Sequence, residues 1–268
     1  MRAGFTAGAE ASPVLLRDVE QLLRTSGPHA GERGLSVIYG ATEGLPLATC
    51  DADVALTPRH ARRCALGGGV CLGRAADGVQ LSVDPTIWHR LGAHPPLPLL
   101  GELGELTAAG PLVAGGGPLA TGDLGTIDAE GLVWFFGRAQ QTVRCRPPLG
   151  SVPPVAVEMV CLQGSGLDRC ALVGLAPRAP KSTPHLPVLV VQIASEAFDA
   201  GAVRARLRTA LQGSLWSPML AADVRFVRYP HEWPVDARHS SKCNRAQLAK
   251  WAASLPVCEL SPVCENGD

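Results

Sequence analysis

The spacing of apolar positions changes along the chain, and the change separates two regions. Between residues 68 and 137, short apolar runs are interrupted by frequent glycines, which is typical of short strands joined by tight turns. The strongest run covers residues 132–136 and ends at Gly137 and Arg138, shortly after a D-A-E-G turn at residues 128–131. We therefore expect small β-sheets or a barrel in this region.

Beyond the proline pairs at 147–148 and 153–154, strand-like and helix-like patterns alternate. Asp199 is placed to cap one helix, whose apolar residues then recur on a single face. The predicted strands are 170–175, 187–193 and 224–229, and the predicted helices are 199–213 and 245–255. Together they describe an α+β module of about a hundred residues, a common domain size.

The N-terminal region predicts one helix and one strand. Ser12 and Pro13 are a favourable N-cap and first helical residue. An apolar stripe follows them, made of Leu15, Val19, Leu22 and Leu23. Residues 35–39 form a short buried-strand pattern that ends at Gly40, so residues 39–43 are expected at a strand end, where α/β proteins often bind ligands.

Composition and charge narrow the classes of function. The 268 residues contain 24 basic and 24 acidic side chains, so the formal net charge is zero and does not favour nucleic acid or anionic membrane as a partner. The most apolar run, residues 187–193, is too short to span a bilayer. Nine cysteines without a C-x-x-C pair or a zinc-ligand spacing indicate reduced thiols and a cytoplasmic protein.

Three motifs carry the candidate chemistry. They are I-Y-G-A-T-E-G at residues 38–44, A-T-G-D-L at 120–124 and P-V-D-A-R-H-S-S-K at 234–242. In this order they resemble the nucleotide-handling motifs of the AMP-forming acyl ligases, the adenylate-forming superfamily. The narrower V-D-x-R-H-x-x-K form resembles the β-lactone synthetases of bacterial olefin biosynthesis, and the resemblance covers roughly residues 1 to 255.

The resemblance implies an adenosine-binding site for ATP and AMP. Tyr39 would place its ring against adenine, and Gly40 would let the backbone approach the base. The small-residue turn at Gly8 resembles the segment that brackets the adenine from the other side. Taken alone, Tyr39 could equally be a core aromatic residue at a strand end.

The resemblance also assigns the residues that would hold the ribose, the phosphates and the metal. Asp123 and Arg138 would bind the ribose, Thr42 the phosphate, and Glu43 would carry Mg²⁺, a cation that prefers carboxylate oxygen. From the residues alone, Asp123 could be a turn former beside glycine. Arg138 and Glu43 could be solvated surface charges.

Lys242 is the candidate catalytic residue. In the family that this chain resembles, a C-terminal lysine contacts the acyl carboxylate and the α-phosphate, where a compact mobile cation stabilises developing charge. A lysine in a loop is most often merely solvated. Here the motif order and the amphipathic helix that follows favour the catalytic interpretation.

The implied fold is a truncated adenylating-enzyme fold of two bodies. Residues 1–138 would form a partial α/β layer with a small β-barrel-like part, the remnant of a large AMP-binding domain. Residues 141–255 would form a compact α+β domain that carries the lysine, and residues 256–268 a loose tail. The implied substrate is a fatty or β-hydroxy fatty acid that is activated as its acyl-adenylate, and the resemblance to β-lactone synthetases implies that a β-lactone can follow.

The chain also departs from the family. The S/T-G-T-T-G-x-P-K phosphate loop that would precede Tyr39 is absent, which predicts a C-terminal fragment without activity of its own. The hinge position reads Ala139-Gln140 instead of an acidic residue, and prolines at 147–148 replace an R-G-rich loop. A separate N-terminal half is one implied partner, and exposed apolar positions on the first helix would mark its absence. The alternative is a non-catalytic remnant that binds a nucleotide or a partner protein.

Overall fold

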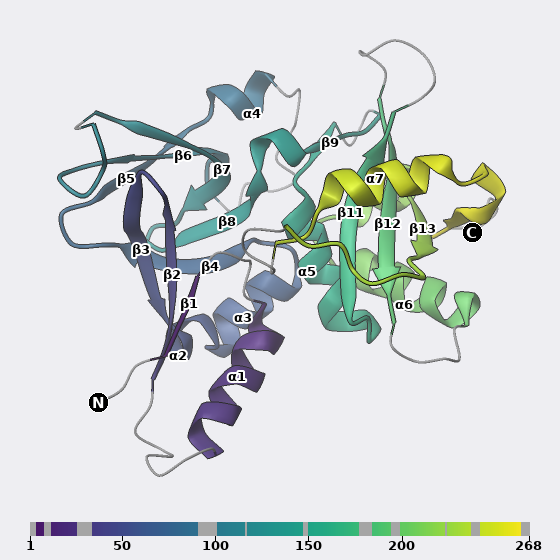
Figure 1. Cartoon of the computed structure of the whole chain (residues 1–268), viewed down its shortest axis with the longest axis horizontal. Coiled ribbons are helices and arrows are strands. Elements are labelled where there is room, and N and C mark those ends of the chain that lie inside the picture. Colours follow the sequence, from purple (N-terminus) through teal and green to yellow (C-terminus); the bar gives the residue numbers. More distant parts are fainter. Residues whose placement is uncertain are drawn as a thin grey trace. The chain divides into compact units, whose positions relative to one another are not determined.

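The computed structural model describes the chain in ten segments: residues 4–7, 12–25, 34–90, 101–115, 117–146, 150–176, 184–193, 199–222, 224–236 and 242–263. The chain divides into two compact units (Figure 1). The first unit contains Met1–Cys64, Gly68–Trp88 and Pro98–Phe136, and the second contains Ala65–Gly67, His89–Leu97 and Gly137–Asp268. The predicted boundaries at residues 138 and 141 remain a prediction.

An eight-stranded sheet organises the first unit, with strand order β1-β2-β3-β4-β8-β7-β6-β5. Its strands are β1 (Gly4–Ala7), β2 (Leu35–Ala41), β3 (Gly44–Asp51), β4 (Val70–Ala75), β5 (Gln80–Asp84), β6 (Gly104–Ala109), β7 (Leu119–Ile127) and β8 (Val133–Arg138). Strand β1 pairs with β2 in parallel, whereas β2, β3, β4 and β8 pair successively antiparallel. Strands β1 and β5 lie at the two ends of this order, and a barrel-like part is not confirmed.

The first helix, α1 (Pro13–Thr25), begins where the sequence predicts. The Ser12 hydroxyl accepts a hydrogen bond from the Leu15 backbone N–H at 3.1 Å, as expected of an N-cap residue. Leu15 and Leu22 are 49% and 63% exposed, as expected for an apolar stripe without a partner, while Leu16 is buried. The buried side of α1 is therefore centred on Leu16, a residue outside the predicted stripe.

Three shorter helices complete the first unit, α2 (Ala52–Ala55), α3 (Pro58–Ala65) and α4 (Thr86–Arg90). The D-A-E-G turn forms before β8 as predicted: Asp128 accepts hydrogen bonds from the backbone N–H groups of Glu130 and Leu132, and Gly131 has φ +74°. This turn fixes the direction in which β8 leaves β7.

The second unit contains a four-stranded sheet in the order β11-β12-β13-β14 and a two-stranded sheet of β9 and β10. The strands are β9 (Val143–Arg144), β10 (Ser151–Val152), β11 (Arg169–Leu175), β12 (Leu186–Gln192), β13 (Arg225–Arg228) and β14 (Ser261–Pro262). The helices are α5 (Pro154–Ser165), α6 (Ala200–Gln212) and α7 (Arg245–Ser254), with short 3₁₀ turns at Ala139–Gln141, Ser217–Ala222 and Val257–Glu259.

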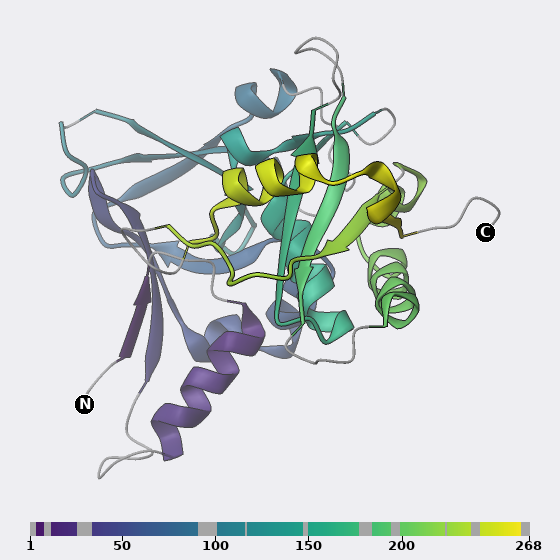
Figure 2. The same ribbon diagram turned by 45° about the vertical axis from the view of Figure 1, so that its right-hand side comes forward.

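Helices cover both faces of the four-stranded sheet. Figures 1 and 2 show α7 on one face and α5 with α6 on the other. Leu248 and Ala252 of α7 pack with Val173 and Val188 in the core of the first face. Asp199 caps α6 by accepting hydrogen bonds from the N–H groups of Gly201 and Ala202, as the sequence predicts.

The C-terminal segment differs from the expectation. Residues 257–263 are folded instead of forming part of a loose tail: β14 pairs antiparallel with β13, and Leu260 and Val263 are buried. The tail pattern is short and rich in proline, so its two buried apolar residues were too few to suggest a strand. Among the described residues, no helix is long and apolar enough to cross a membrane.

Candidate functional site

Two of the three motifs meet in the first unit. The Tyr39 hydroxyl, at the end of β2, donates a hydrogen bond to Oδ2 of Asp123 in β7 at 2.9 Å. The two residues are 84 positions apart in the chain. Asp123 is only 6% exposed and Tyr39 is half-buried, so this contact lies at the edge of the core. The motif that would bind adenine and the motif that would bind ribose therefore share one location.

The segment around Asp123 is fixed by its own hydrogen bonds. The Thr121 hydroxyl accepts from the Asp123 backbone N–H at 3.1 Å and donates to the Leu106 carbonyl at 2.7 Å. Gly122 has φ +74°, a conformation that favours glycine, and its N–H donates to the buried carboxylate of Glu105 at 2.8 Å. The T-G-D motif is thus held in one geometry before any ligand arrives.

The turn between β2 and β3 carries Thr42 and Glu43, which are both exposed. The Glu43 carbonyl accepts a hydrogen bond from the Ala114 N–H at 2.7 Å, which ties the turn to the segment between β6 and β7. A Cβ added to Gly40 would lie 2.6 Å from the Gly44 carbonyl oxygen. The fold itself therefore requires glycine at position 40, whether or not a base binds there.

The position of two predicted site residues relative to this location remains untested. Arg138 is exposed at the end of β8 and belongs to the second unit, and Gly8 lies outside the described residues. The described residues contain no group of three His, Cys, Asp or Glu side chains that could hold a metal ion. Assignment of Mg²⁺ to Glu43 remains a prediction; a magnesium site in nucleotide enzymes commonly uses one or two carboxylates together with the substrate phosphates.

A partly buried cation contacts the turn that connects β7 to β8. The Arg63 guanidinium carbon lies 3.9 Å from the centroid of the Trp134 ring, and a guanidinium nitrogen is 3.6 Å from Oδ2 of Asp128. Burial lowers the pKa of Arg63 to about 10. Burial alone would raise the pKa of Asp128, but hydrogen bonds from Trp134 and the backbone outweigh it and hold that pKa below its usual value. No local sequence pattern reveals this cluster, because Arg63 lies 71 positions from Trp134.

Lys242, the candidate catalytic residue, lies in the second unit and is half-buried. Its carbonyl accepts a hydrogen bond from the Asp236 N–H at 2.8 Å, and the Asn244 N–H donates to the Pro234 carbonyl at 2.9 Å. These backbone bonds close a loop whose intervening residues, 237–241, lie outside the described structure. The lysine is thus held through its backbone at the end of that loop.

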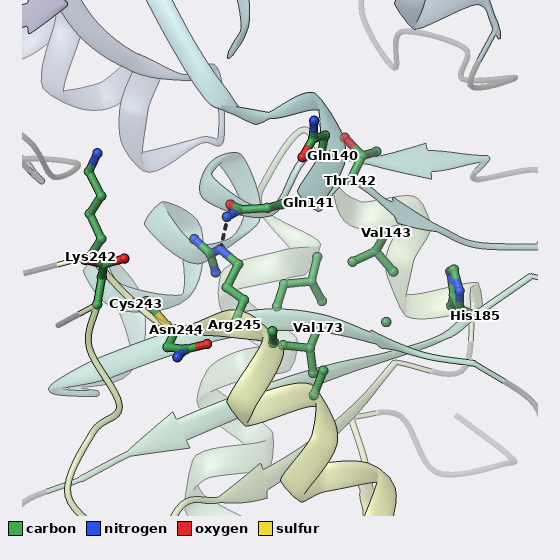
Figure 3. Close-up of a pocket in the computed structure, with 15 residues that line it drawn as sticks. Gln140, Gln141, Thr142, Val143, Val173, His185, Lys242, Cys243, Asn244 and Arg245 are labelled. Carbon is green, nitrogen blue, oxygen red and sulfur yellow. Dashed lines mark hydrogen bonds between the residues drawn. The ribbon is translucent and has the colours of Figure 1, made fainter. Parts of the chain in front are cut away.

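Lys242 lines a pocket of about 530 Å³ in the second unit, between the start of α7, strand β11 and the 3₁₀ turn at Ala139–Gln141. In Figure 3 the Lys242 side chain extends away from Arg245, whose guanidinium faces Gln141. The Thr142 hydroxyl and Nδ1 of His185 are buried here without a hydrogen-bond partner among the described residues. Residues of the predicted hinge, of the start of α7 and of the segment around Lys242 therefore line the same pocket.

A buried ion pair anchors the start of α7, directly after the lysine. Arg245 Nη2 donates to Oε2 of Glu158 at 2.8 Å, and Nη1 donates to Oε1. The two side chains are 11% and 5% exposed. Glu158 also accepts from the Leu172 N–H at 2.7 Å, and Arg245 Nε donates to Gln141. Glu158 stands alone as a charge within the apolar run of α5, a signal that the sequence analysis did not use.

No protein-family model matches the chain. It is 29% identical to the olefin β-lactone synthetase of Xanthomonas campestris pv. campestris over 285 aligned positions, which cover 96% of this chain and 48% of that protein. Among solved structures, the amide bond synthetase McbA of Marinactinospora thermotolerans has a TM-score of 0.63 at 22% identity, covering 92% of this chain and 46% of McbA. The o-succinylbenzoate coenzyme A synthetase of Bacillus subtilis, in complex with ATP and magnesium ion, has a TM-score of 0.62 at 18% identity and covers 92% and 46%.

These comparisons confirm the resemblance to the adenylate-forming superfamily. The chain has a mixed α/β fold similar to that of adenylate-forming enzymes, and its curated relatives are olefin β-lactone synthetases. The chain spans about half the length of the curated relatives and solved structures that it matches. The assignment of individual site residues to adenine, ribose, phosphate and metal is not tested by these likenesses.

Proposed function

We propose that this chain supplies the adenosine-binding residues and the catalytic lysine of an ATP-dependent, AMP-forming ligase. The observation that carries the proposal is the hydrogen bond between Tyr39 and Asp123, which joins two motifs from distant parts of the sequence. A buried carboxylate with an aromatic ring beside it suits an adenosine: the carboxylate accepts hydrogen bonds from the ribose hydroxyls, and the ring stacks on the base. ATP, AMP and Mg²⁺ are the proposed ligands, with Arg138 and Gly8 as further nucleotide contacts.

The proposed substrate is a fatty or β-hydroxy fatty acid. The substrate carboxylate would attack the α-phosphorus of ATP, forming the acyl-adenylate and releasing pyrophosphate. Lys242 would stabilise the charge that develops on the carboxylate and the α-phosphate. The similarity to olefin β-lactone synthetases supports a β-hydroxy acid, whose own hydroxyl would then displace AMP and close the lactone, in a cytoplasmic pathway of olefin biosynthesis.

We also propose that a second polypeptide segment, the counterpart of the unaligned half of the relatives, completes the enzyme. The exposed stripe on α1 supports this proposal, because Leu15 and Leu22 present apolar surface that a partner would cover. Residues that grip the β- and γ-phosphates would come from this partner. The described chain by itself is therefore expected to bind adenosine but not to form acyl-adenylates.

Isotope exchange between pyrophosphate and ATP tests the proposed reaction. The chain would be co-expressed with the unaligned half of the Xanthomonas relative and assayed with a β-hydroxy fatty acid. We expect exchange from the pair and none from the chain alone. Replacing Lys242→Ala should lower the exchange rate about 10²–10³-fold and leave ATP affinity nearly unchanged, because the lysine acts on charge formed in the transition state.

The matched control is Lys250→Ala, which removes an exposed lysine from α7 close to the same pocket. It should leave exchange at the unmutated rate. If Lys242→Ala and Lys250→Ala behave alike, Lys242 has no catalytic role. If the assembled pair binds AMP but never exchanges, the chain is a nucleotide-binding remnant, the alternative to an enzyme.

A further inference from the structure

Two buried thiols meet between neighbouring strands of the first unit. The Sγ atoms of Cys50 in β3 and Cys71 in β4 are 3.8 Å apart, and the two residues are 3% and 5% exposed. The pair plays no part in the proposed ligase reaction. Its geometry places one sulfur within reach of the other after only a small movement, since a disulfide bond spans about 2 Å.

The backbone brings these thiols together. Strand β3 pairs with β4 antiparallel through Thr49 and Arg74, so Cys50 follows next to Gly73. Gly73 has φ +79°, and a Cβ there would lie 1.9 Å from the Thr49 carbonyl oxygen. The register of β4 against β8 also shifts between Cys71 and Gly73. Because only glycine tolerates this approach, the sequence maintains a local irregularity that turns Cys71 toward Cys50.

The surroundings give the two sulfurs different reactivity. The hydrogen bond from Cys50 lowers the pKa of the Cys71 thiol against the opposing effect of burial, and a backbone hydrogen bond from Gly73 lowers it further. The same hydrogen bond, followed by burial, raises the pKa of Cys50. Cys71 is therefore the better nucleophile, since the thiolate is the reactive form, and Cys50 retains the proton.

A second buried cysteine pair lies in the second unit. The hydrogen bond with Cys161, followed by burial, raises the pKa of Cys170 well above its ordinary value. Cys170 therefore resembles Cys50, the member of the first pair that retains its proton.

We propose that Cys50 and Cys71 are an oxidation site that forms an intramolecular disulfide on exposure to hydrogen peroxide. The Cys71 thiolate attacks one peroxide oxygen, the O–O bond breaks, and hydroxide leaves with Cys71 as a sulfenic acid. The Cys50 sulfur then attacks the Cys71 sulfur, its proton is released, and the sulfenic oxygen leaves as water. In total, two thiols lose two electrons and two protons, and one peroxide becomes two waters.

The crosslink would tie the end of β3 to β4, at the opposite end of β3 from the turn that carries Thr42 and Glu43. The thiols face the interior, so a small neutral oxidant reaches them and bulky disulfides do not. A bulky disulfide should therefore modify the exposed Cys258 and leave this pair unmodified, whereas peroxide should reach both.

The proposal is tested by peptide mapping. The folded chain is treated with hydrogen peroxide, and its peptides are then analysed by mass spectrometry. We expect a peptide pair joined through Cys50 and Cys71 that is lighter by two hydrogens and is released by dithiothreitol. In Cys50→Ser the crosslink should be lost, and Cys71 should instead accumulate a sulfenic acid that dimedone traps. In Cys71→Ser neither the crosslink nor an adduct at Cys50 is expected.

Cys161→Ser is the control and should leave the crosslink unchanged. Circular dichroism of the reduced variants verifies that each has folded. The proposal is overturned if Cys258 is oxidised while Cys50 and Cys71 both remain thiols. It is equally overturned if the crosslink appears only after unfolding, or if Cys50 rather than Cys71 gives the trapped sulfenic acid.

Discussion

The first unit fixes its candidate ligand-binding side chain by hydrogen bonds, whereas among the described residues of the second unit the candidate catalytic residue is held through its backbone. Asp123 is buried and accepts a hydrogen bond from Tyr39, and the strand segment before it is fixed by hydrogen bonds of Thr121 and Gly122. Lys242 is half-buried at the end of a loop, and the hydrogen bonds that close this loop join backbone atoms of Pro234, Asp236, Lys242 and Asn244. One region is preorganised for a ligand, and the other carries a cation on a long side chain.

This difference agrees with two chemical tasks. A site that recognises the same adenosine before and after reaction gains from rigid hydrogen-bonding groups, because little ordering remains to be done when the ligand binds. A cation that acts on charge formed in the transition state needs reach more than rigidity. The rigid element near Lys242 is instead the Arg245–Glu158 pair, which fixes the start of α7.

The largest expected effect comes from removing the anchor of the second unit. Glu158→Ala would leave the Arg245 charge buried and the Leu172 N–H without its acceptor, so we expect the free energy of unfolding to fall by about 3–5 kcal/mol. Urea denaturation monitored by tryptophan fluorescence measures this change. Glu130→Ala is the control, because the exposed Arg59–Glu130 pair should contribute no more than about 1 kcal/mol. If both variants lose the same free energy of unfolding, the buried Glu158–Arg245 pair contributes no more to stability than the exposed Arg59–Glu130 pair.

A smaller loss of stability is expected when the hydrogen bond between Tyr39 and Asp123 is removed from the first unit. Tyr39→Phe keeps the aromatic face but removes the hydroxyl that donates to Asp123, so stability should fall by about 0.5–1.5 kcal/mol. In a double-mutant cycle with Asp123→Ala, the two losses should be less than additive, because each removes the same hydrogen bond. Additive losses would show that the contact does not couple the two motifs.

The sequence predicts the elements whose signals are local. The Ser12 cap, the Asp199 cap, the apolar face of α6 and the turn at Asp128 depend on residues a few positions apart, and each forms as predicted. The strands predicted between residues 68 and 137 are also present, because glycines mark their ends. The resemblance to adenylate-forming enzymes likewise follows from short motifs whose residue types and order the sequence displays.

Other features depend on contacts that no local pattern contains. Helix α5 is buried on nearly all sides, so it lacks the polar face that reveals a surface helix, and its charge Glu158 finds its partner 87 positions away. Leu16 is buried in place of the predicted stripe because the neighbours of α1, and not its own periodicity, decide which side is covered. The pairing of Cys50 with Cys71 depends on a strand register that composition cannot supply.

The central claim is tested most directly by calorimetric titration with AMP. The titration compares the unmutated chain with the Asp123→Asn variant. The amide is isosteric and can still accept a bond from Tyr39, but it cannot accept from both ribose hydroxyls and lacks the charge. We predict that the unmutated chain binds AMP and that Asp123→Asn weakens binding about ten- to a hundredfold, the range expected for hydrogen bonds to a charged group. Asp77→Asn, at an exposed turn of the same unit, should bind like the unmutated chain. Equal AMP affinity with aspartate and asparagine at position 123, or no binding by the unmutated chain, would contradict the claim that this site holds adenosine.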